Sequence, residues 1–147
     1  MQDRDKQDAQ ALAIAHKMRA DEGTGPAFDI QIETVRLGFA RLSMRIRADM
    51  LNGHGMAHGG MIFTLADTAF AYACNSQNIA SVALNATISF LSPVKLGERL
   101  IAEAREETTA GRTGIYAVTV YGEGERIVAV FQGLSRTIGG QIISDET

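Results

Sequence analysis

The chain has 147 residues, of which 46% are hydrophobic and 21% charged, a composition typical of one soluble globular domain with its own core. A formal net charge of −3 excludes the basic surface that nucleic-acid binding requires. The single cysteine, Cys74, excludes an internal disulfide and fits a reducing compartment. Because the chain has neither eighteen consecutive apolar residues nor the apolar core of a signal peptide, we expect a cytoplasmic protein without membrane contact.

The N-terminal segment, residues 1–25, predicts one short helix. From about Gln7 to Ala20, apolar residues recur at helical spacing and charged residues take the opposite side. We expect residues 1–6 to be frayed, because chain ends without anchoring contacts usually are. The string Gly23-Thr24-Gly25-Pro26 contains the residue types that end helices. It separates the segment from the core, which we place at residues 28–140.

The core begins with a predicted hairpin. Residues 28–33 and 40–47 both alternate between apolar and polar side chains, which is the period of a strand. Gly38 marks the turn between them. The alternation indicates a sheet with one face on the core and one face in water.

The stretch from Asn52 to Ser76 is a glycine-broken loop followed by a helix, which we expect to start at Gly59 or Gly60 and to end near Cys74 or Asn75. The helix is apolar nearly all the way round, so we expect it to be buried. Its one carboxylate, Asp67, should therefore have a raised pKa. Two interpretations are open: a functional acid, or a partly exposed aspartate held by Thr64 or Thr68.

Four further strand-like runs follow the helix, separated by turns that contain glycine or proline. In the first of them, alternation predicts Val82, Leu84, Ala86, Ile88 and Phe90 on one face and Asn85, Thr87 and Ser89 on the other. The runs cover residues 81–91, 99–108, 113–121 and 126–138. The chain order predicts an α+β fold in which a six-stranded antiparallel sheet wraps around the long buried helix, with the short N-terminal helix added.

The start of the long helix and its acid together indicate a catalytic arrangement. Gly59 and Gly60 leave unpaired N–H groups at the positive end of the helix dipole, which suits an oxyanion, although a simple tight turn would also use these glycines. Asp67 lies eight residues further on, roughly 12 Å along the helix axis. Groups that act on one carbonyl must lie within about 3 Å of it. If both belong to one site, that site combines two helices packed antiparallel across a two-fold axis.

Two strings carry a resemblance to a known family. His58-Gly59-Gly60 leads into the helix that bears Asp67, and Leu91-Ser92-Pro93-Val94-Lys95-Leu96-Gly97-Glu98 follows the next strand. In this order they resemble the hotdog-fold acyl-CoA thioesterases, above all the phenylacetic acid degradation type. The resemblance covers about residues 28–140 of a single domain that we assign to residues 1–147.

The resemblance implies a role for each residue around the helix start. Asp67 would act as general base toward water or as nucleophile through an anhydride, and both options stay open. The Gly59 N–H would polarise the thioester carbonyl, and Asn52 and His58 would position the carbonyl and order the loop. The implied substrate is the coenzyme A thioester of an aryl acid, of the phenylacetyl or hydroxyphenylacetyl type. The implied catalytic unit is a homodimer, in a homotetramer built of two dimers, with no metal and no cofactor.

On the acyl side, Gly60 would leave room for the substrate beside Gly59. The acyl group would enter apolar space near Phe63, Phe70 and Tyr72, a prediction that depends mainly on the resemblance.

Further along the chain, some relatives carry a serine on the strand after the helix, where this sequence has Ala83. Asn85 or Ser81 could take over its role of positioning water. Arg112 and Lys95 are the basic residues that we expect near the CoA phosphates.

Other functions are alternatives to thioester hydrolysis. A hydratase or dehydratase on the same fold would need a histidine paired with an acid on the helix, and the helix offers only Asp67. A non-catalytic acyl-CoA-binding regulator, or an oligomeric scaffold, is a further alternative. His54 and His58 lack a third metal ligand nearby, and Cys74 is expected to be an inert core thiol because it lies late in an apolar helix.

Overall fold

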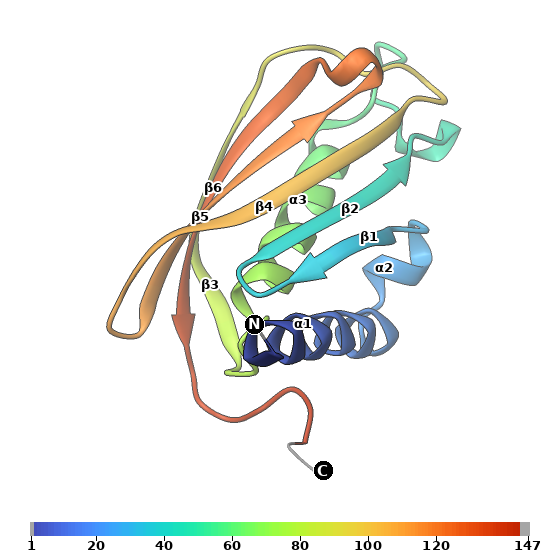
Figure 1. The fold of residues 1–147 in the computed structure, drawn as a ribbon. Coiled ribbons are helices and arrows are strands. Elements are labelled where there is room, and N and C mark those ends of the chain that lie inside the picture. The colour runs from blue at the N-terminus through green and yellow to red at the C-terminus, as the bar shows by residue number, and fades with distance from the viewer. Residues whose placement is uncertain (1, 145–147) are drawn as a thin grey trace.

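The chain forms one curved antiparallel sheet with a central helix against its inner face, as Figure 1 shows for the computed structural model. The structure describes residues 2–144. None of the helices in that range is long and apolar enough to cross a membrane. The elements are α1 (Gln2–Asp21), α2 (Thr24–Ala27), β1 (Gln31–Arg36), β2 (Phe39–Arg45), α3 (Gly59–Cys74), β3 (Ser81–Phe90), β4 (Arg99–Ala110), β5 (Thr113–Tyr121) and β6 (Ile127–Thr137).

The six strands lie in the order β1-β2-β4-β5-β6-β3, and every neighbouring pair is antiparallel. β1 and β3 are therefore the two edges (Figure 1). The inner face buries apolar side chains with a period of two that is clearest in β5, where Tyr116, Val118 and Val120 are buried. The predicted α+β fold, the number of strands and the bounds of α3 are confirmed.

α3 is buried on most of its circumference. Leu65, Ala66 and Ala69 are fully inaccessible, whereas Thr64, Asp67 and Ala71 are only half-buried. Residues at this spacing lie on one side of a helix. We call Thr64, Asp67 and Ala71 the open stripe, because the chain's own sheet does not cover them completely.

The structure corrects the predicted faces of β3. A bulge between Ala83 and Asn85 shifts the register, so that Ala83 pairs with Ser135 while Ala86 pairs with Gly133. Both partners are buried, which places Ala83 and Ala86 on the face toward the helix. Val82, which pairs with Arg136, therefore does not share a face with the even-numbered residues after the bulge, because one extra residue inverts the alternation. Leu84, at the bulge, pairs with no residue of β6.

The N-terminal segment also differs from the prediction. α1 already includes residues 2–6, which are helical and not frayed, and residue 1 lies outside the described residues. Acidic side chains in the first turn and the ion pair between Arg4 and Asp8, 3.6 Å apart, favour an early helix start. Asp8 also accepts a hydrogen bond of 2.9 Å from the amide of Leu37, which ties α1 to the β1–β2 turn.

Two smaller corrections follow the first helix. The string around Pro26 does not only end α1 but forms the single helical turn α2. β1 starts at Gln31 and not at Phe28, because Asp29 adopts a left-handed conformation with φ of 52° that no strand residue takes.

Substitution of Gly133 in β6 tests how tightly α3 packs against the sheet. A β-carbon at this position would lie 2.6 Å from the Phe70 ring, which is itself only 1% exposed. We expect Gly133→Ala to lower the free energy of unfolding by about 1–3 kcal/mol through overpacking. Gly23→Ala is the control, because its β-carbon would meet no atom within 4 Å, and it should change stability by less than about 1 kcal/mol. Urea denaturation of both variants measures the difference, and equal stabilities would contradict this packing.

Candidate active site

The start of α3 leaves one backbone donor free. His58 is the N-cap, and its Nδ1 accepts a hydrogen bond of 2.9 Å from the amide of Gly60. The amides of Met61 and Ile62 donate to the carbonyl oxygen of His58, at 2.9 and 3.4 Å. Within residues 2–144, the Gly59 N–H donates no hydrogen bond. It is thus the one amide of the first turn that remains available to a ligand.

Asn52 lies in the loop that precedes this amide. Its side-chain oxygen accepts hydrogen bonds from the amides of His54 (2.9 Å) and Met56 (3.1 Å), which fixes the orientation of its carboxamide. The Nδ2 group donates to no other residue of the described chain. Asn52 and Gly59 line the same hollow of 370 Å³. Its other walls are mainly apolar and include Met56, Ile62, Phe90 and Pro93.

Steric crowding explains the two glycines. A β-carbon at Gly59 would lie 3.1 Å from the ring of Phe90, and one at Gly60 would lie 3.0 Å from His58 Nδ1. Side chains here would disturb the hollow or the cap. Phe90 was not predicted at the site. It lies there because β3 runs antiparallel to α3 and ends beside the helix start.

Asp67 is half-buried on the open stripe, and burial raises the pKa of its carboxyl above the ordinary aspartate value, as predicted. The alternative in which a threonine holds it is wrong. Thr64 donates to the carbonyl oxygen of Gly60 (2.8 Å), and Thr68 donates to that of Thr64 (2.6 Å). Asp67 forms no hydrogen bond or ion pair with another residue in the described range, so its oxygens are free to accept a proton.

One chain does not bring the acid and the amide together. Eight residues of helix separate Gly59 from Asp67, which is roughly 12 Å along the axis. Asp67 does not line the hollow that contains Gly59. The chain thus presents both groups on one helix, the donor at its start and the acid midway.

Comparison with known proteins shows the family to which the chain belongs. The model of the Thioesterase superfamily matches residues 54–129. Acyl-coenzyme A thioesterase PaaI of Escherichia coli K12 is 44% identical over 131 residues, which cover 89% of this chain and 94% of that protein. The chain belongs to the Thioesterase superfamily.

Solved structures show the same fold. The E. coli PaaI protein from the phenylacetic acid degradation operon superposes with a TM-score of 0.89 at 42% identity, covering 91% of this chain and 97% of that one. A Streptococcus mutans UA159 protein bound to acetyl CoA gives a TM-score of 0.73 at 27% identity, covering 76% and 90%. The predicted hotdog fold and the thioesterase class are both confirmed.

In this thioesterase the three aromatic residues predicted for the acyl group lie in different places. Phe70 is a core residue, and its ring centroid is 5.6 Å from that of Tyr116. Tyr72 is fully buried and donates to the carboxylate of Glu22. Phe63 is half-buried, one turn before Asp67 on α3. Of the three, Phe63 is the one that is not fully buried, and its spacing of four residues places it on the same side of α3 as the acid.

The predicted residues of β3 also separate. Ala83 lies on the face toward α3, opposite Ser135. Asn85 pairs with Leu134, between the inward-facing Gly133 and Ser135, and so lies on the outer face. The hydroxyl of Ser81 donates to the carbonyl oxygen of Ile79 at 2.9 Å.

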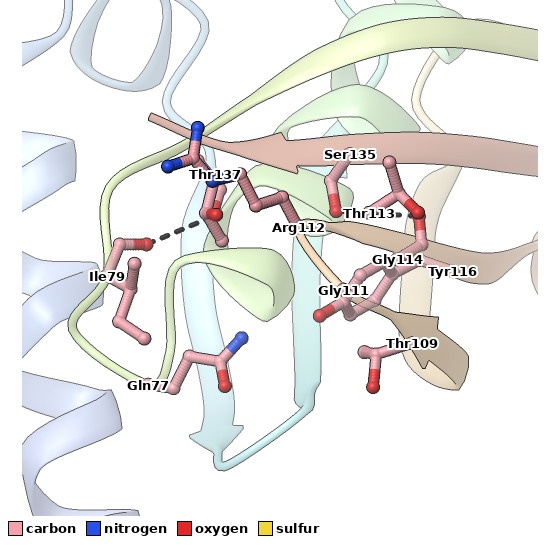
Figure 2. Close-up of a pocket in the computed structure, with 11 residues that line it drawn as sticks. Gln77, Ile79, Thr109, Gly111, Arg112, Thr113, Gly114, Tyr116, Ser135 and Thr137 are labelled. Atoms are coloured by element: carbon pink, nitrogen blue, oxygen red, sulfur yellow. Dashed lines mark hydrogen bonds between the residues drawn. The ribbon is translucent and has the colours of Figure 1, made fainter. Parts of the chain in front are cut away.

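Arg112 lines a second hollow of 180 Å³, shown in Figure 2, between the β4–β5 turn and the start of β3. Its walls include Gln77, Ile79, Ser81 and Tyr116. The guanidinium of Arg112 makes no hydrogen bond or ion pair with any other described residue. The hollow lies at the opposite end of β3 from Gly59.

The remaining reactive side chains do not form a competing site. Burial, and to a smaller degree the charge of Asp67, raise the pKa of the Cys74 thiol to about 12, which keeps it protonated. His54 is exposed in the loop, and His58 is occupied by the helix cap. Within residues 2–144, no three His, Cys, Asp or Glu side chains gather as metal ligands.

The His58 cap can be tested by paired substitutions. His58→Ala removes the acceptor for the Gly60 amide and should lower the free energy of unfolding by about 1 kcal/mol. His58→Asn supplies a side-chain oxygen that can accept at the same position, so it should retain most of that stability. Urea denaturation at neutral pH compares the two, and an alanine variant as stable as the asparagine variant would show that the cap contributes nothing.

Proposed function

We propose that this protein is a cytoplasmic acyl-CoA thioesterase, one catalytic domain over residues 1–147, that hydrolyses aryl-acyl-CoA of the phenylacetyl or hydroxyphenylacetyl type to the free acid and CoA. The observation that carries the proposal is the pairing, on one buried helix, of a free amide at Gly59 with an unpartnered acid at Asp67. The identity to an acyl-coenzyme A thioesterase and the acetyl CoA bound to another relative support the choice of thioester.

The free amide supplies electrophilic assistance. The thioester carbonyl oxygen would accept from the Gly59 N–H and the Asn52 Nδ2 group, both of which line the 370 Å³ hollow. These donors stabilise the negative charge that develops on this oxygen when the carbonyl carbon becomes tetrahedral. The apolar walls strengthen such hydrogen bonds because they exclude water.

Asp67 supplies the base. It would take a proton from water as the water oxygen bonds to the carbonyl carbon, after which the C–S bond breaks and the proton passes to the leaving thiolate. Alternatively, its carboxylate attacks first, expels the thiolate and forms an anhydride that water then hydrolyses. In both routes the products are the carboxylic acid and free CoA, and no metal or cofactor takes part. Burial favours either role because it makes the carboxylate more basic.

Two copies of the chain would complete each site. β3 is an edge strand that exposes apolar side chains, with Val82 43%, Leu84 52% and Phe90 51% accessible. Antiparallel pairing of β3 with its copy across a two-fold axis would set the two α3 helices antiparallel. It would bring Gly59 of one chain toward Asp67 of the other. Val130 and Ile127, exposed along β6, offer apolar area through which two such dimers would form a tetramer.

The same pairing would join the two hollows. β3 begins at the Arg112 hollow and ends at the Gly59 hollow, so an antiparallel copy sets each hollow beside the other type. Arg112, whose guanidinium has no partner in the described chain, would then face the CoA phosphates of a substrate held at the partner's amide. The acyl group would lie near Phe63 and Ala83, with Gly60 leaving it room, while Phe70 would support this space from the core.

Removal of the acid tests the mechanism. We expect Asp67→Asn to lower the release of free thiol from phenylacetyl-CoA at least about a hundredfold, the effect of losing a general base. Because burial raises the folded-state pKa, the ionised form is disfavoured in the folded protein at neutral pH, so the neutral variant should be as stable as wild type or more stable. Asp21→Asn, at the exposed end of α1, is the matched control.

Thiol release and thermal denaturation measure the two effects. Normal turnover by Asp67→Asn would refute the role of this residue. Binding of acyl-CoA by the wild-type protein without thiol release would instead favour the non-catalytic regulator. Hydration chemistry is the weaker alternative, because α3 carries no histidine.

Mixing two inactive variants tests whether the site is shared. Asp67→Asn and Gly59→Val should each be inactive alone. In a mixed dimer, the intact acid of one chain would meet the intact amide of the other, so random exchange of subunits should restore about a quarter of the wild-type activity. Thiol release after co-expression or refolding together is the measurement. If the two groups act within one chain, mixing restores nothing.

A further inference from the structure

The loop between β3 and β4, residues 91–98, forms one wall of the Gly59 hollow, and we call it the wall loop. Leu91, Pro93 and Val94 line the hollow directly. The carbonyl oxygen of Val94 accepts a hydrogen bond of 2.8 Å from the amide of Ala57, two residues before Gly59. Met56 and Lys95 add a β-bridge between the same segments. The position of the wall loop is therefore coupled to the position of the free amide.

Arg126, in the turn before β6, binds the wall loop at several points. Its Nε donates to Ser92 Oγ (3.3 Å) and its Nη2 to the carbonyl oxygen of Pro93 (2.8 Å). The same Nη2 reaches Glu98 Oε2 at 3.2 Å, and Nη1 donates to the carbonyl oxygen of Glu123 at 3.3 Å. One planar side chain thus joins both ends of the wall loop to the β5–β6 turn.

Glu98 completes this arrangement from the other end of the loop. Its carboxylate is nearly buried and accepts hydrogen bonds from the amides of Lys95 (2.7 Å) and Glu123 (3.3 Å). Burial alone would raise the pKa of Glu98, but these two amides and the Arg126 guanidinium lower it below the ordinary glutamate value. The carboxylate therefore stays charged at neutral pH and keeps the loop closed on Arg126.

We infer that Arg126 and Glu98 are positioning residues for the oxyanion site: they hold the wall loop, and through the Val94–Ala57 hydrogen bond they fix the direction of the Gly59 amide. Neither side chain lines the Gly59 hollow, so neither is expected to touch the thioester. The inference rests on the proposed function. A displacement of about 1 Å in a catalytic donor can lower the rate by a factor on the order of a hundred, so a remote pair can control turnover.

Another ion pair of the same chain is a matched control. Arg41 and Glu103 join β2 to β4 at 2.6 Å, and Glu103 is 15% exposed where Glu98 is 8% exposed. Both pairs combine a partly exposed arginine with a largely buried glutamate. Arg41 contacts neither the wall loop nor the Gly59 hollow. A purely structural role for Arg126 predicts that loss of either arginine has the same kind of effect.

The experiment compares Arg126→Ala with Arg41→Ala in the full-length protein, well below both melting temperatures. We expect Arg126→Ala to lower kcat for phenylacetyl-CoA by about tenfold or more with little change in KM, since the lost interaction acts mainly in the transition state. Arg41→Ala should keep wild-type kcat. Arg126→Lys, which retains the charge but not the planar fork, should be intermediate.

Amide hydrogen exchange gives a readout that does not need activity. The amide of Ala57, bonded to the wall loop, should exchange faster in Arg126→Ala and be unchanged in Arg41→Ala. Normal kcat together with unchanged exchange at Ala57 in folded Arg126→Ala would overturn the inference. If Arg126→Ala does not fold, Arg126→Lys and Glu98→Gln are judged by the same two criteria. If wild-type protein releases no thiol, the proposed function fails, and exchange alone decides the role of Arg126.

Discussion

The packing of α3 against the sheet sets the directions of Asp67 and the Gly59 amide, and the contact between Phe70 and Gly133 holds the helix in this position. The Phe70 ring fills the space that a side chain at residue 133 would need. Successive helix residues are turned by about 100°, so Asp67, three residues before Phe70, is rotated by only about 60° from it and lies at the margin of the buried face. The same rotation buries Leu65 and Ala69 completely. Asp67 stays half-buried because the neighbouring residues of α3 take up the contacts with the sheet.

α3 carries two polar groups without a hydrogen-bond partner, whereas the fully buried polar side chains of the described chain all have one. Within residues 2–144, no fully buried side-chain nitrogen or oxygen lacks a hydrogen bond. Asp67 and the Gly59 amide are the exceptions at the margin of the core, where a ligand can reach them. Cys74 does not compete for the proton, because burial raises the pKa of its thiol to about 12 and keeps it protonated at neutral pH. Asp67 is therefore the one titratable side chain of the open stripe.

The sequence was sufficient for features that depend on local period and insufficient for those that depend on register or on distant partners. The apolar run after Gly60 and the alternation of β5 predicted their elements within a residue. The bulge at Ala83 was missed because an extra residue in a strand leaves no composition signal. The Arg126–Glu98 pair was also missed, since its members are 28 residues apart and meet only after β4 and β5 have folded. Asp67 and Gly59 could be predicted as a pair because both lie in one continuous stretch, and their roles stay a prediction.

The two edge strands of the sheet, β1 and β3, differ in whether another element covers them. β1 is covered by α1, which is held there by Arg19 donating to the Ile30 carbonyl oxygen at 2.7 Å and by the Asp8 contact with Leu37. β3 has ten residues, no charge and no proline, and within the described range no strand pairs with its outer edge.

Edge strands are normally protected by charge, proline or cover, because a bare apolar edge pairs with any available strand. A second copy of β3 satisfies the same hydrogen bonds on both sides and leaves no further edge to extend, as closed two-fold symmetry requires. In the proposed dimer, the unprotected edge of β3 would be the element that joins the amide of one chain to the acid of the other.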